Sequence, residues 1–479
     1  MTDVEIVGSG PNALAAAVTL ARAGLSVRVY ERMSTLGGGA RTAADVAPGF
    51  RHDTCSAVHP LAVASPFFRA FGLSRRVDFV TPDISFAHPL PGGRSGLAYR
   101  DLDRTVDSLG RDGAAYRRLI GPLSERAREV ARFTGSPLLR VPPHPVVLAR
   151  FGIRALLQGS PLWNAGFAEE TAPAMITGVA AHAIMHQPSL VGAAAGLALQ
   201  AHAHAAGWPI PLGGSQAISD ALAEDLRAHG GEIVTDHEVR STSELTARAV
   251  VLDVTPRALI RLAGGRMPAG YRARLERFRY GSGAAKVQFA LSGPVPWADE
   301  RLAGAGTIHL GGTRAQIAAS ENAVLAGRHP ASPYVLVSQP SAFDASRAPA
   351  GGHSLWTYTH VPTGSTLDRT EAVIETVERH APGFRDLIVA SRSWSAEDLA
   401  DENPNYVGGD IGAGAATFRQ LLARPVASPE PWVTPMPGIY LTGASTSPGP
   451  GVHGQSGWFA ARSVLRREFG VGRMPSLAP

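Results

Sequence analysis

Cysteine and lysine are almost absent from this sequence of 479 residues. Cys55 is the single cysteine, so the sequence excludes an internal disulfide and a multi-cysteine metal site and favours a reducing cytosol. Lys286 is the single lysine among 45 basic residues. The arginines, which dominate the formal net charge of +5, are scattered without dense runs or interleaved aromatic residues. Nucleic acid is therefore not expected as a partner.

Long hydrophobic runs are also lacking. The two most apolar stretches, 13–23 and 179–206, are interrupted by Arg22 in the first and by His182 and Pro188 in the second, so neither is a convincing membrane span. A strand pattern that begins at residue 4 leaves no room for a secretory leader. We therefore expect a cytoplasmic protein, soluble or at most bound to a membrane surface. A chain of this length predicts two intertwined domains.

The first 31 residues predict a βαβ unit. Residues 4–7 form a mostly apolar strand, 11–23 an alanine-rich helix and 25–31 a second strand. A glycine turn between strand and helix brings backbone N–H groups to a pyrophosphate, and an acid that ends the next strand can bond a ribose hydroxyl. The alternative is an ordinary glycine turn. The candidate cofactor contacts are Gly8, Gly10, Pro11, Asn12, Ala13 and Glu31, and Asn12 is equally explained as a polar residue in the first helical turn.

A second glycine cluster follows the second strand, at residues 36–42. The first motif alone does not separate FAD from NAD. A second set of backbone amides with an arginine offers contacts to a further stretch of phosphate or ribityl chain, which suits a long, extended dinucleotide. A loop needed only for turning is the alternative. The candidate contacts here are Gly38, Gly39, Ala40, Arg41 and Thr42.

The motifs together resemble the phytoene desaturase branch of the FAD-dependent amine oxidase-like superfamily. The residues that carry the resemblance are the two glycine clusters with Glu31, Gly49-Phe50-Arg51-His52-Asp53, the segment from Gly213-Gly214 to Val239, and the closing run from Gly438 to Gly457. The resemblance implies noncovalent, extended FAD, with the Val239 backbone near the adenine and the closing run near the ribityl chain and flavin. It adds Gly443, Ala444, Gly451, Val452 and His453 to the cofactor contacts.

The fold expected from the resemblance is α/β. A Rossmann-like FAD-binding domain is assembled from residues 1–75, 213–280 and 430–479. Residues 76–212 and 281–429 form an α+β substrate domain with a mixed sheet, and substrate binds in the crevice between the two. A last helix, residues 457–468, points its N-terminus at the flavin, where its dipole favours the negative charge of the reduced form.

Four residues are candidates for catalytic roles: Lys286, His59, His453 and Asp410. The position of Lys286 is similar to that of a lysine which holds a water near the flavin in amine oxidase relatives; a solvated lysine at a strand edge is the alternative. Each histidine is a possible base or hydrogen-bond donor, or purely structural. Asp410 lies on a glycine-flanked loop and equally suits a turn. Histidines at 182, 186, 202 and 204 lack an acidic or cysteine companion, so no metal site is expected.

The resemblance predicts an enzyme that removes hydride from a C–H bond of a largely apolar small molecule, with FAD as acceptor and oxygen or a quinone as terminal oxidant. Three alternatives stay open: an amine or amino-acid oxidase that makes hydrogen peroxide, a flavin-binding regulatory protein with little turnover, and a redox-neutral isomerase. Peripheral membrane contact is possible, although the sequence does not identify the apolar docking surface that carotenoid desaturases usually present. The sequence does not indicate the oligomeric state.

Overall fold

A five-stranded parallel sheet carries the N-terminal glycine turn in the computed structural model, which describes residues 2–141, 143–163 and 165–479. The strand order is β16-β10-β1-β2-β9. Its strands are short apolar runs, as expected for strands covered on both faces. Their bounds are β1 (Val4–Val7), β2 (Val27–Tyr30), β9 (Glu232–Val234), β10 (Ala249–Leu252) and β16 (Ile439–Leu441).

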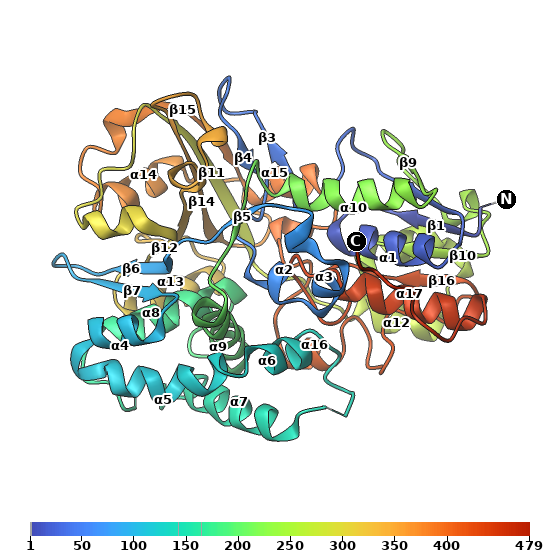
Figure 1. The fold of residues 1–479 in the computed structure, drawn as a ribbon, viewed down its shortest axis with the longest axis horizontal. Coiled ribbons are helices and arrows are strands. Elements are labelled where there is room, and N and C mark those ends of the chain that lie inside the picture. The colour runs from blue at the N-terminus through green and yellow to red at the C-terminus, as the bar shows by residue number, and fades with distance from the viewer. Residues whose placement is uncertain (1, 142, 164) are drawn as a thin grey trace.

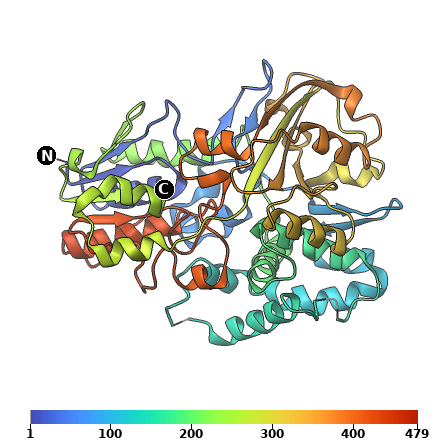
Figure 2. The same cartoon turned by 180° about the vertical axis from the view of Figure 1, so that it is seen from behind.

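Helices cover both faces of this sheet (Figures 1 and 2). One face packs against α1 (Pro11–Arg22), α10 (Gln216–Ala228) and α17 (Gln455–Glu468), and the other against α11 (Pro256–Ala263) and α12 (Ala269–Glu276). Proline at the first position of α1 suits a helix start, because that position donates no helical hydrogen bond. The predicted helices at 11–23, 215–229 and 457–468 match three of these to within about two residues.

A second, seven-stranded sheet is mixed, with the order β15-β11-β14-β13-β12-β6-β7. Among the described strands of this second sheet, only the β12–β6 pair is parallel. This sheet packs on α14 (Thr370–Glu378). Its strands are β6 (Ile84–Pro89), β7 (Ser95–Tyr99), β11 (Gly283–Leu291), β12 (Ala305–Leu310), β13 (Val335–Ser338), β14 (His353–Val361) and β15 (Ile388–Trp394).

A layer of helices lies below the mixed sheet in Figure 1. Its helices are α4 (Leu102–Ser108), α5 (Gly113–Ser124), α6 (Ala127–Thr134), α7 (Pro145–Gln158), α8 (Thr171–Ala180) and α9 (Leu190–Ala205). They share an apolar core built around Tyr116, Met175 and Leu197, with Trp208 behind it. The central helix is α9, which packs against α5, α6, α7 and α8.

Apart from single 3-10 turns, the other elements are the helix α13 (Arg314–Leu325), which packs against α8 and β14, and several short strands and helices. The short elements are β3 (Thr42–Ala43), β4 (His52–Asp53), α2 (Pro60–Ala64), α3 (Pro66–Phe71), β5 (Phe79–Val80), β8 (Ile210–Pro211), α15 (Ala396–Glu402) and α16 (Phe418–Leu422). The α/β fold with a Rossmann-like parallel sheet and a separate mixed sheet is thus confirmed. The strands of the parallel sheet come from three separated segments of chain, which all lie within the ranges predicted for the FAD-binding domain; the boundaries themselves stay a prediction.

Candidate functional site

A cavity of about 1010 Å³ runs from the carboxyl ends of the parallel strands to the face of the mixed sheet. One end, here called the glycine lobe, is lined by both glycine clusters, the ends of β2 and β10, and the loop before α17. The other end, here called the apolar lobe, is lined by residues of α6, α7 and α9, by His182 and Trp208, and by Thr307, Leu336, Trp356 and Tyr358 of the mixed sheet. This is the crevice position in which open α/β sheets bind ligands.

The first glycine turn forms a shallow cradle at the N-terminus of α1. Gly8 has a φ of 94°, a conformation that glycine adopts without steric cost. A Cβ atom on Gly10 would lie 2.6 Å from Asp253 Oδ2, so only glycine leaves this surface open. Gly8, Gly10, Pro11 and Asn12 all line the cavity. Asn12 Oδ1 is buried without a hydrogen-bond partner, which is consistent with a ligand contact at this end of the helix.

Glu31 lies at the end of β2 and lines the glycine lobe, as expected. Its carboxylate accepts hydrogen bonds from the Ser9 backbone N–H at 3.0 Å, from the Ser9 hydroxyl at 2.6 Å and from the Met33 N–H at 2.9 Å. These bonds fix the carboxylate beside the glycine turn. A bond to a ribose hydroxyl stays a prediction.

Asp253 is a residue of the glycine lobe that the sequence analysis missed. It directly follows β10 and lines the cavity. Its carboxylate faces the turn at Gly10, and Cβ atoms built on Gly8 or Gly443 would also come within 3.1 Å of its side chain. Burial, with a smaller contribution from the charge of Glu31, raises the pKa of Asp253 to about 7. An acid that ends the apolar strand 249–252 was the available signal.

The second glycine cluster packs on the first, because a Cβ atom on Gly38 would lie 3.1 Å from the Gly10 Cα. Arg41 lines the cavity, but its Nη2 forms an ion pair with Glu402 at 2.8 Å. Thr42 is turned away: its hydroxyl donates to Asp53 Oδ1 at 2.7 Å and accepts from the Gln216 N–H. It therefore positions the start of α10.

Most of the predicted cofactor contacts lie together around the glycine lobe. Those that line the cavity are Gly8, Gly10, Pro11, Asn12, Glu31, Gly38, Gly39, Ala40, Arg41, Val239, Ala444, Gly451, Val452 and His453. Ala13, Thr42 and Gly443 are not among the lining residues. Gly443 contacts Asp253 from behind. The individual contacts to a cofactor remain predictions.

His453 and Asp410 both line the cavity, and both have their polar atoms engaged by the backbone. His453 Nδ1 accepts from the Gln455 N–H at 3.1 Å, so Nε2 carries the proton and donates to the Gly449 carbonyl at 3.0 Å. Burial lowers the pKa of His453 to about 4. The Asp410 carboxylate accepts from three N–H groups, those of Gly281, Gly412 and Gly414, which favours the loop-forming interpretation.

His59 has one nitrogen without a partner. The Ser215 hydroxyl donates its one hydrogen to the Ser56 carbonyl. Its oxygen therefore accepts the hydrogen bond from His59, whose Nε2 lies 2.7 Å away and carries the proton. Nδ1 is then an unprotonated acceptor, buried and unpartnered, on a residue that lines the cavity. Burial lowers the pKa of His59 to about 4. Of the four catalytic candidates, His59 is the one with a free proton-accepting atom.

Lys286 lies on the cavity side of β11, paired with Tyr358 of β14, but does not line the cavity. Its Nζ donates to the Thr54 carbonyl at 2.9 Å and lies 3.5 Å from the centre of the Trp394 ring. Burial lowers its pKa to about 8. The solvated-lysine alternative does not hold, since the side chain is buried. Its amine bonds the carbonyl of Thr54, and the next residue, Cys55, lines the cavity.

The apolar lobe is lined by small and aliphatic side chains with a few neutral polar groups. All the charged lining residues, among the described parts of the chain, belong to the glycine lobe or to the loops beside it, namely Glu31, Arg32, Arg41, Glu238, Asp253, Arg261, Glu402 and Asp410. The lining residues between 131 and 208 and those of the mixed sheet include no acid, arginine or lysine. The lobe therefore suits an uncharged, largely apolar molecule.

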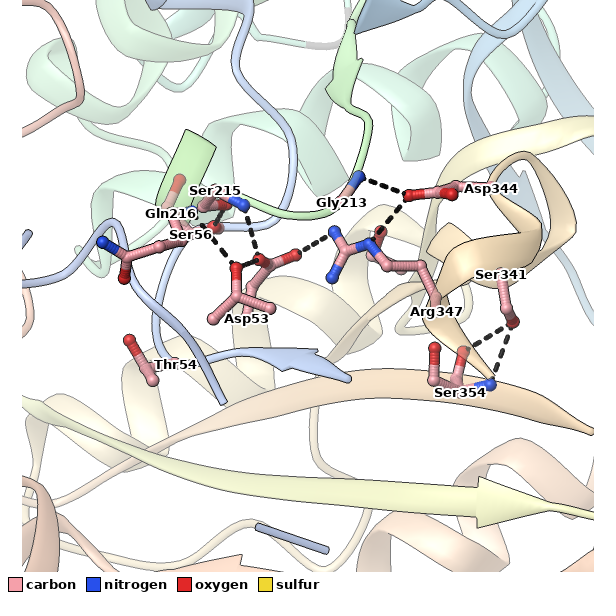
Figure 3. Close-up of polar contacts among 12 residues, drawn as sticks. Asp53, Thr54, Ser56, Gly213, Ser215, Gln216, Ser341, Asp344, Arg347 and Ser354 are labelled. Carbon is pink, nitrogen blue, oxygen red and sulfur yellow. Dashed lines mark hydrogen bonds and ion pairs between the residues drawn. The ribbon is translucent and has the colours of Figure 1, made fainter. Parts of the chain in front are cut away.

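A buried polar network holds the glycine lobe against the mixed sheet (Figure 3). Arg347 Nη2 donates to Asp53 Oδ2 at 2.7 Å, and Arg347 Nε lies 3.2 Å from Asp344 Oδ2. Asp344 Oδ2 accepts from the Gly213 N–H, and Asp53 Oδ1 from the Ser215 N–H. The network thus fixes the chain where it enters α10.

The residues present fit a dinucleotide of the length of FAD. The glycine cradle, the acid ending β2 and the orphaned Asn12 Oδ1 lie at one end of the cavity, and the loop before α17 lies farther along it. The cavity volume of about 1010 Å³ exceeds what one small ligand needs. Space therefore remains for a second molecule in the apolar lobe.

Comparisons with known proteins also find a Rossmann-like domain at the N-terminus and the fold of solved oxidases. Residues 6–71 match the NAD(P)-binding Rossmann-like domain. The chain is 26% identical to pyridine nucleotide-disulfide oxidoreductase domain-containing protein 2 of Rattus norvegicus, over 97% of this chain and 93% of the rat protein. It is 30% identical to a 4,4'-diapolycopen-4-al dehydrogenase of Metabacillus indicus over 26% of each protein. A solved putrescine oxidase variant covers 97% of this chain and 99% of its own, with a TM-score of 0.58 at 17% identity.

These similarities support the predicted resemblance: residues 6–71 match a Rossmann-like dinucleotide-binding domain, and the whole chain has the fold of solved amine oxidases. The chain is homologous to pyridine nucleotide-disulfide oxidoreductase domain-containing protein 2 and shares the fold of solved amine oxidases.

Proposed function

We propose that this protein removes hydride from a C–H bond of a largely apolar small molecule and leaves a carbon–carbon double bond. The observation that carries the proposal is the apolar lobe, whose described lining residues bear no charged side chain. An apolar molecule loses no solvation on entering such a site, whereas a buried ion would need a counter-charge. The partial similarity to a 4,4'-diapolycopen-4-al dehydrogenase supports an apolar substrate as well.

The reaction breaks two C–H bonds on neighbouring carbons. One hydrogen leaves as hydride with both electrons, and the other leaves as a proton. Bound FAD supplies the two-electron acceptor, and oxygen or a quinone then takes up the electrons. His59 Nδ1 is the candidate proton acceptor, because it has no hydrogen-bond partner and its ring is held by the Ser215 hydroxyl. The lobe's apolar walls exclude water from the reacting carbons.

An amine or amino-acid oxidase is the alternative that the fold allows. It would place a cationic or zwitterionic substrate in the apolar lobe, where no described carboxylate faces it. Lys286, which first favoured this alternative, is engaged with the Thr54 carbonyl and the Trp394 ring. Both observations support the apolar substrate over the amine.

Anaerobic visible spectroscopy of the holoprotein tests the proposal. We expect isoprenoid alkenes or polyenes to bleach the flavin band and to yield a product two hydrogens lighter. Bleaching by amines instead would establish the oxidase. A product of unchanged mass would indicate an isomerase, and a flavin that no compound reduces would favour a binding protein; each of these outcomes overturns the desaturase proposal.

The helix α7 exposes an apolar surface beside the cavity. No described helix is long and apolar enough to cross a bilayer. The large apolar side chains exposed on and around α7 are Leu138, Leu139, Val141, Val146, Ile153, Leu156, Leu157 and Leu162. Leu138 and Leu156 also line the cavity. Arg128 and Arg132 of α6 and Arg150 of α7 are exposed nearby.

We propose that this α7 patch rests on an anionic membrane surface and receives apolar substrate there, since apolar and basic side chains together suit that surface. Sedimentation with phosphatidylserine vesicles tests the contact. Val146→Asp with Ile153→Asp should abolish sedimentation. Val389→Asp is the matched control, because Val389 is 61% exposed on β15, close to the 62% and 59% of the two patch residues. Equal sedimentation of all variants would contradict the proposal.

A further inference from the structure

Two buried N–H-bearing side chains in the apolar lobe have unsatisfied atoms. His202 lies on α9 and Trp356 on β14, and both line the cavity. His202 is 3% exposed and Trp356 is 5% exposed. His202 Nε2 and Trp356 Nε1 have no hydrogen-bond partner in the protein. Buried polar atoms are normally bonded, so orphaned ones beside a cavity point to a ligand.

His202 interrupts an otherwise apolar helix face. The other lining residues of α9 are Leu190, Val191, Ala194, Ala195, Ala198 and Leu199. An aliphatic residue at position 202 would be buried at a lower free-energy cost than histidine, because an imidazole without a hydrogen-bond partner loses its solvation on burial. The neighbouring His204, by contrast, is fully engaged with the Tyr116 hydroxyl and the Tyr99 carbonyl.

Trp356 lies on the wall of the lobe that the mixed sheet forms. It pairs with Ser338 of the neighbouring strand β13. Tyr358, two residues farther along β14, points to the same side of the sheet and also lines the lobe. Indole Nε1 only donates a hydrogen bond. Its natural partner is an oxygen lone pair.

The polar groups of the apolar lobe are neutral. Burial lowers the pKa of His202 to about 4 and that of His182 to about 3, so both imidazoles are uncharged at neutral pH. No described acid or arginine lines this lobe. A carboxylate or an ammonium group there would lack a counter-charge, whereas a hydroxyl or carbonyl oxygen would match both a tryptophan donor and an imidazole.

We propose that the apolar lobe binds apolar molecules that carry a neutral oxygen function, a hydroxyl or a carbonyl, and that His202 and Trp356 hydrogen-bond with it. The inference rests on the proposed function, because it names the substrate class of the same cavity. His202 and Trp356 are binding residues in this scheme and take no part in hydride transfer.

Isothermal titration calorimetry of the holoprotein with 1-decanol, decylamine and decanoate tests the inference. We expect 1-decanol to bind at least tenfold more tightly than the two charged probes. Trp356→Phe keeps the ring and removes the N–H, and His202→Leu removes the imidazole; each should weaken 1-decanol binding by three- to tenfold while the flavin spectrum stays unchanged. His186→Leu is the matched control, because His186 lies outside the cavity lining.

Wild-type affinity for 1-decanol in both variants, or tighter binding of decylamine or decanoate, would overturn the inference. Calorimetry reports binding without turnover, so the two proposals fail separately. If 1-decanol binds as expected and no alkene or polyene reduces the flavin, the proposed function fails and the binding site stands. If such compounds reduce the flavin and both variants bind 1-decanol with wild-type affinity, the binding site proposed here fails and the proposed function stands.

Discussion

Arg347 and Asp53 form an ion pair of 2.7 Å in which both side chains are fully buried. Asp53 ends β4, close in sequence to the second glycine cluster, whereas Arg347 belongs to the chain between β13 and β14 of the mixed sheet. The pair therefore ties together two parts of the fold that are 294 residues apart.

Removal of Arg347 should be strongly destabilising. Arg347→Ala leaves the carboxylate of Asp53 buried without its counter-charge, which costs about 3–5 kcal/mol. The exposed Arg117–Asp103 pair is the control, and Arg117→Ala should cost at most about 1 kcal/mol. Urea unfolding measures both. Equal losses would show that the buried pair does not hold the two parts together.

FAD affinity should fall as the pH rises through about 7. The pKa of Asp253 is raised to about 7, so above that pH its ionised carboxylate faces the pyrophosphate cradle beside Gly8 and Gly10. The charged group that faces Asp253 is Glu31, which follows β2. Asn405, which donates a hydrogen bond to the Asp253 backbone carbonyl, is uncharged. Binding then requires proton uptake, which weakens affinity by up to about tenfold per pH unit.

Asp253→Asn should remove this pH dependence and bind FAD more tightly at pH 8.5. Fluorescence titration of the apoprotein with FAD between pH 5.5 and 8.5 measures it. Asp236→Asn is the control, since Asp236 is an exposed acid outside the cavity lining. A steep pH dependence that persists in Asp253→Asn would contradict the assignment.

Gly457 is required where α17 meets α1. A Cβ atom there would lie 1.7 Å from the Asn12 backbone carbonyl, so Gly457→Ala should push the helices apart, lower stability by about 1–3 kcal/mol and weaken FAD retention. Gly270→Ala in α12, where an added Cβ meets nothing within 4 Å, should stabilise by up to about 1 kcal/mol. Thermal unfolding and flavin content measure both; a tolerated Gly457→Ala would refute the close approach.

Lys286 should make stability pH-dependent in alkaline solution. Its pKa in the folded protein is lowered to about 8 from 10.5, so between these values the unfolded chain binds the proton more readily. The free energy of unfolding contributed by this group therefore rises from pH 8 to pH 10.5 and is lowest below pH 8. Urea unfolding at pH 7.5 and 9.5 measures this effect. The free energy of unfolding of the wild type minus that of Lys286→Met should be more positive at pH 9.5 than at pH 7.5. Parallel pH profiles would show that the amine is not buried in the charged form.

The parallel sheet was predictable because its signals are local. The apolar run 4–7 is followed by a glycine turn, the run 249–252 is followed by Thr255-Pro256, and Pro11 marks the start of a helix. The strand–turn–helix pattern also fixes where the candidate cofactor contacts in the glycine turn lie. Glu31 ends β2 and lines the cavity for that reason.

The contacts that depend on distant partners were not predictable. Thr42 follows the glycine cluster in sequence, yet its hydroxyl bonds Asp53 and the backbone of Gln216. Lys286 lies on β11 as the only lysine of the sequence, yet its amine is engaged by the Thr54 carbonyl and the Trp394 ring. The exposed α7 face and the orphaned His202 likewise depend on which side of each helix is covered, and a helical pattern alone does not give that.

The packing of α1 against α17 sets an order of assembly. The strand β16 lies at the edge of the parallel sheet, and α17 covers the same face as α1. During synthesis, α10 is available to cover part of α1 early, but the part of α1 that packs against α17 stays uncovered until residues 455–468 have left the ribosome. Chains that end before α17 would therefore expose the side of α1 that this last helix covers, and they would lack the loop at residues 451–453 that lines the glycine lobe.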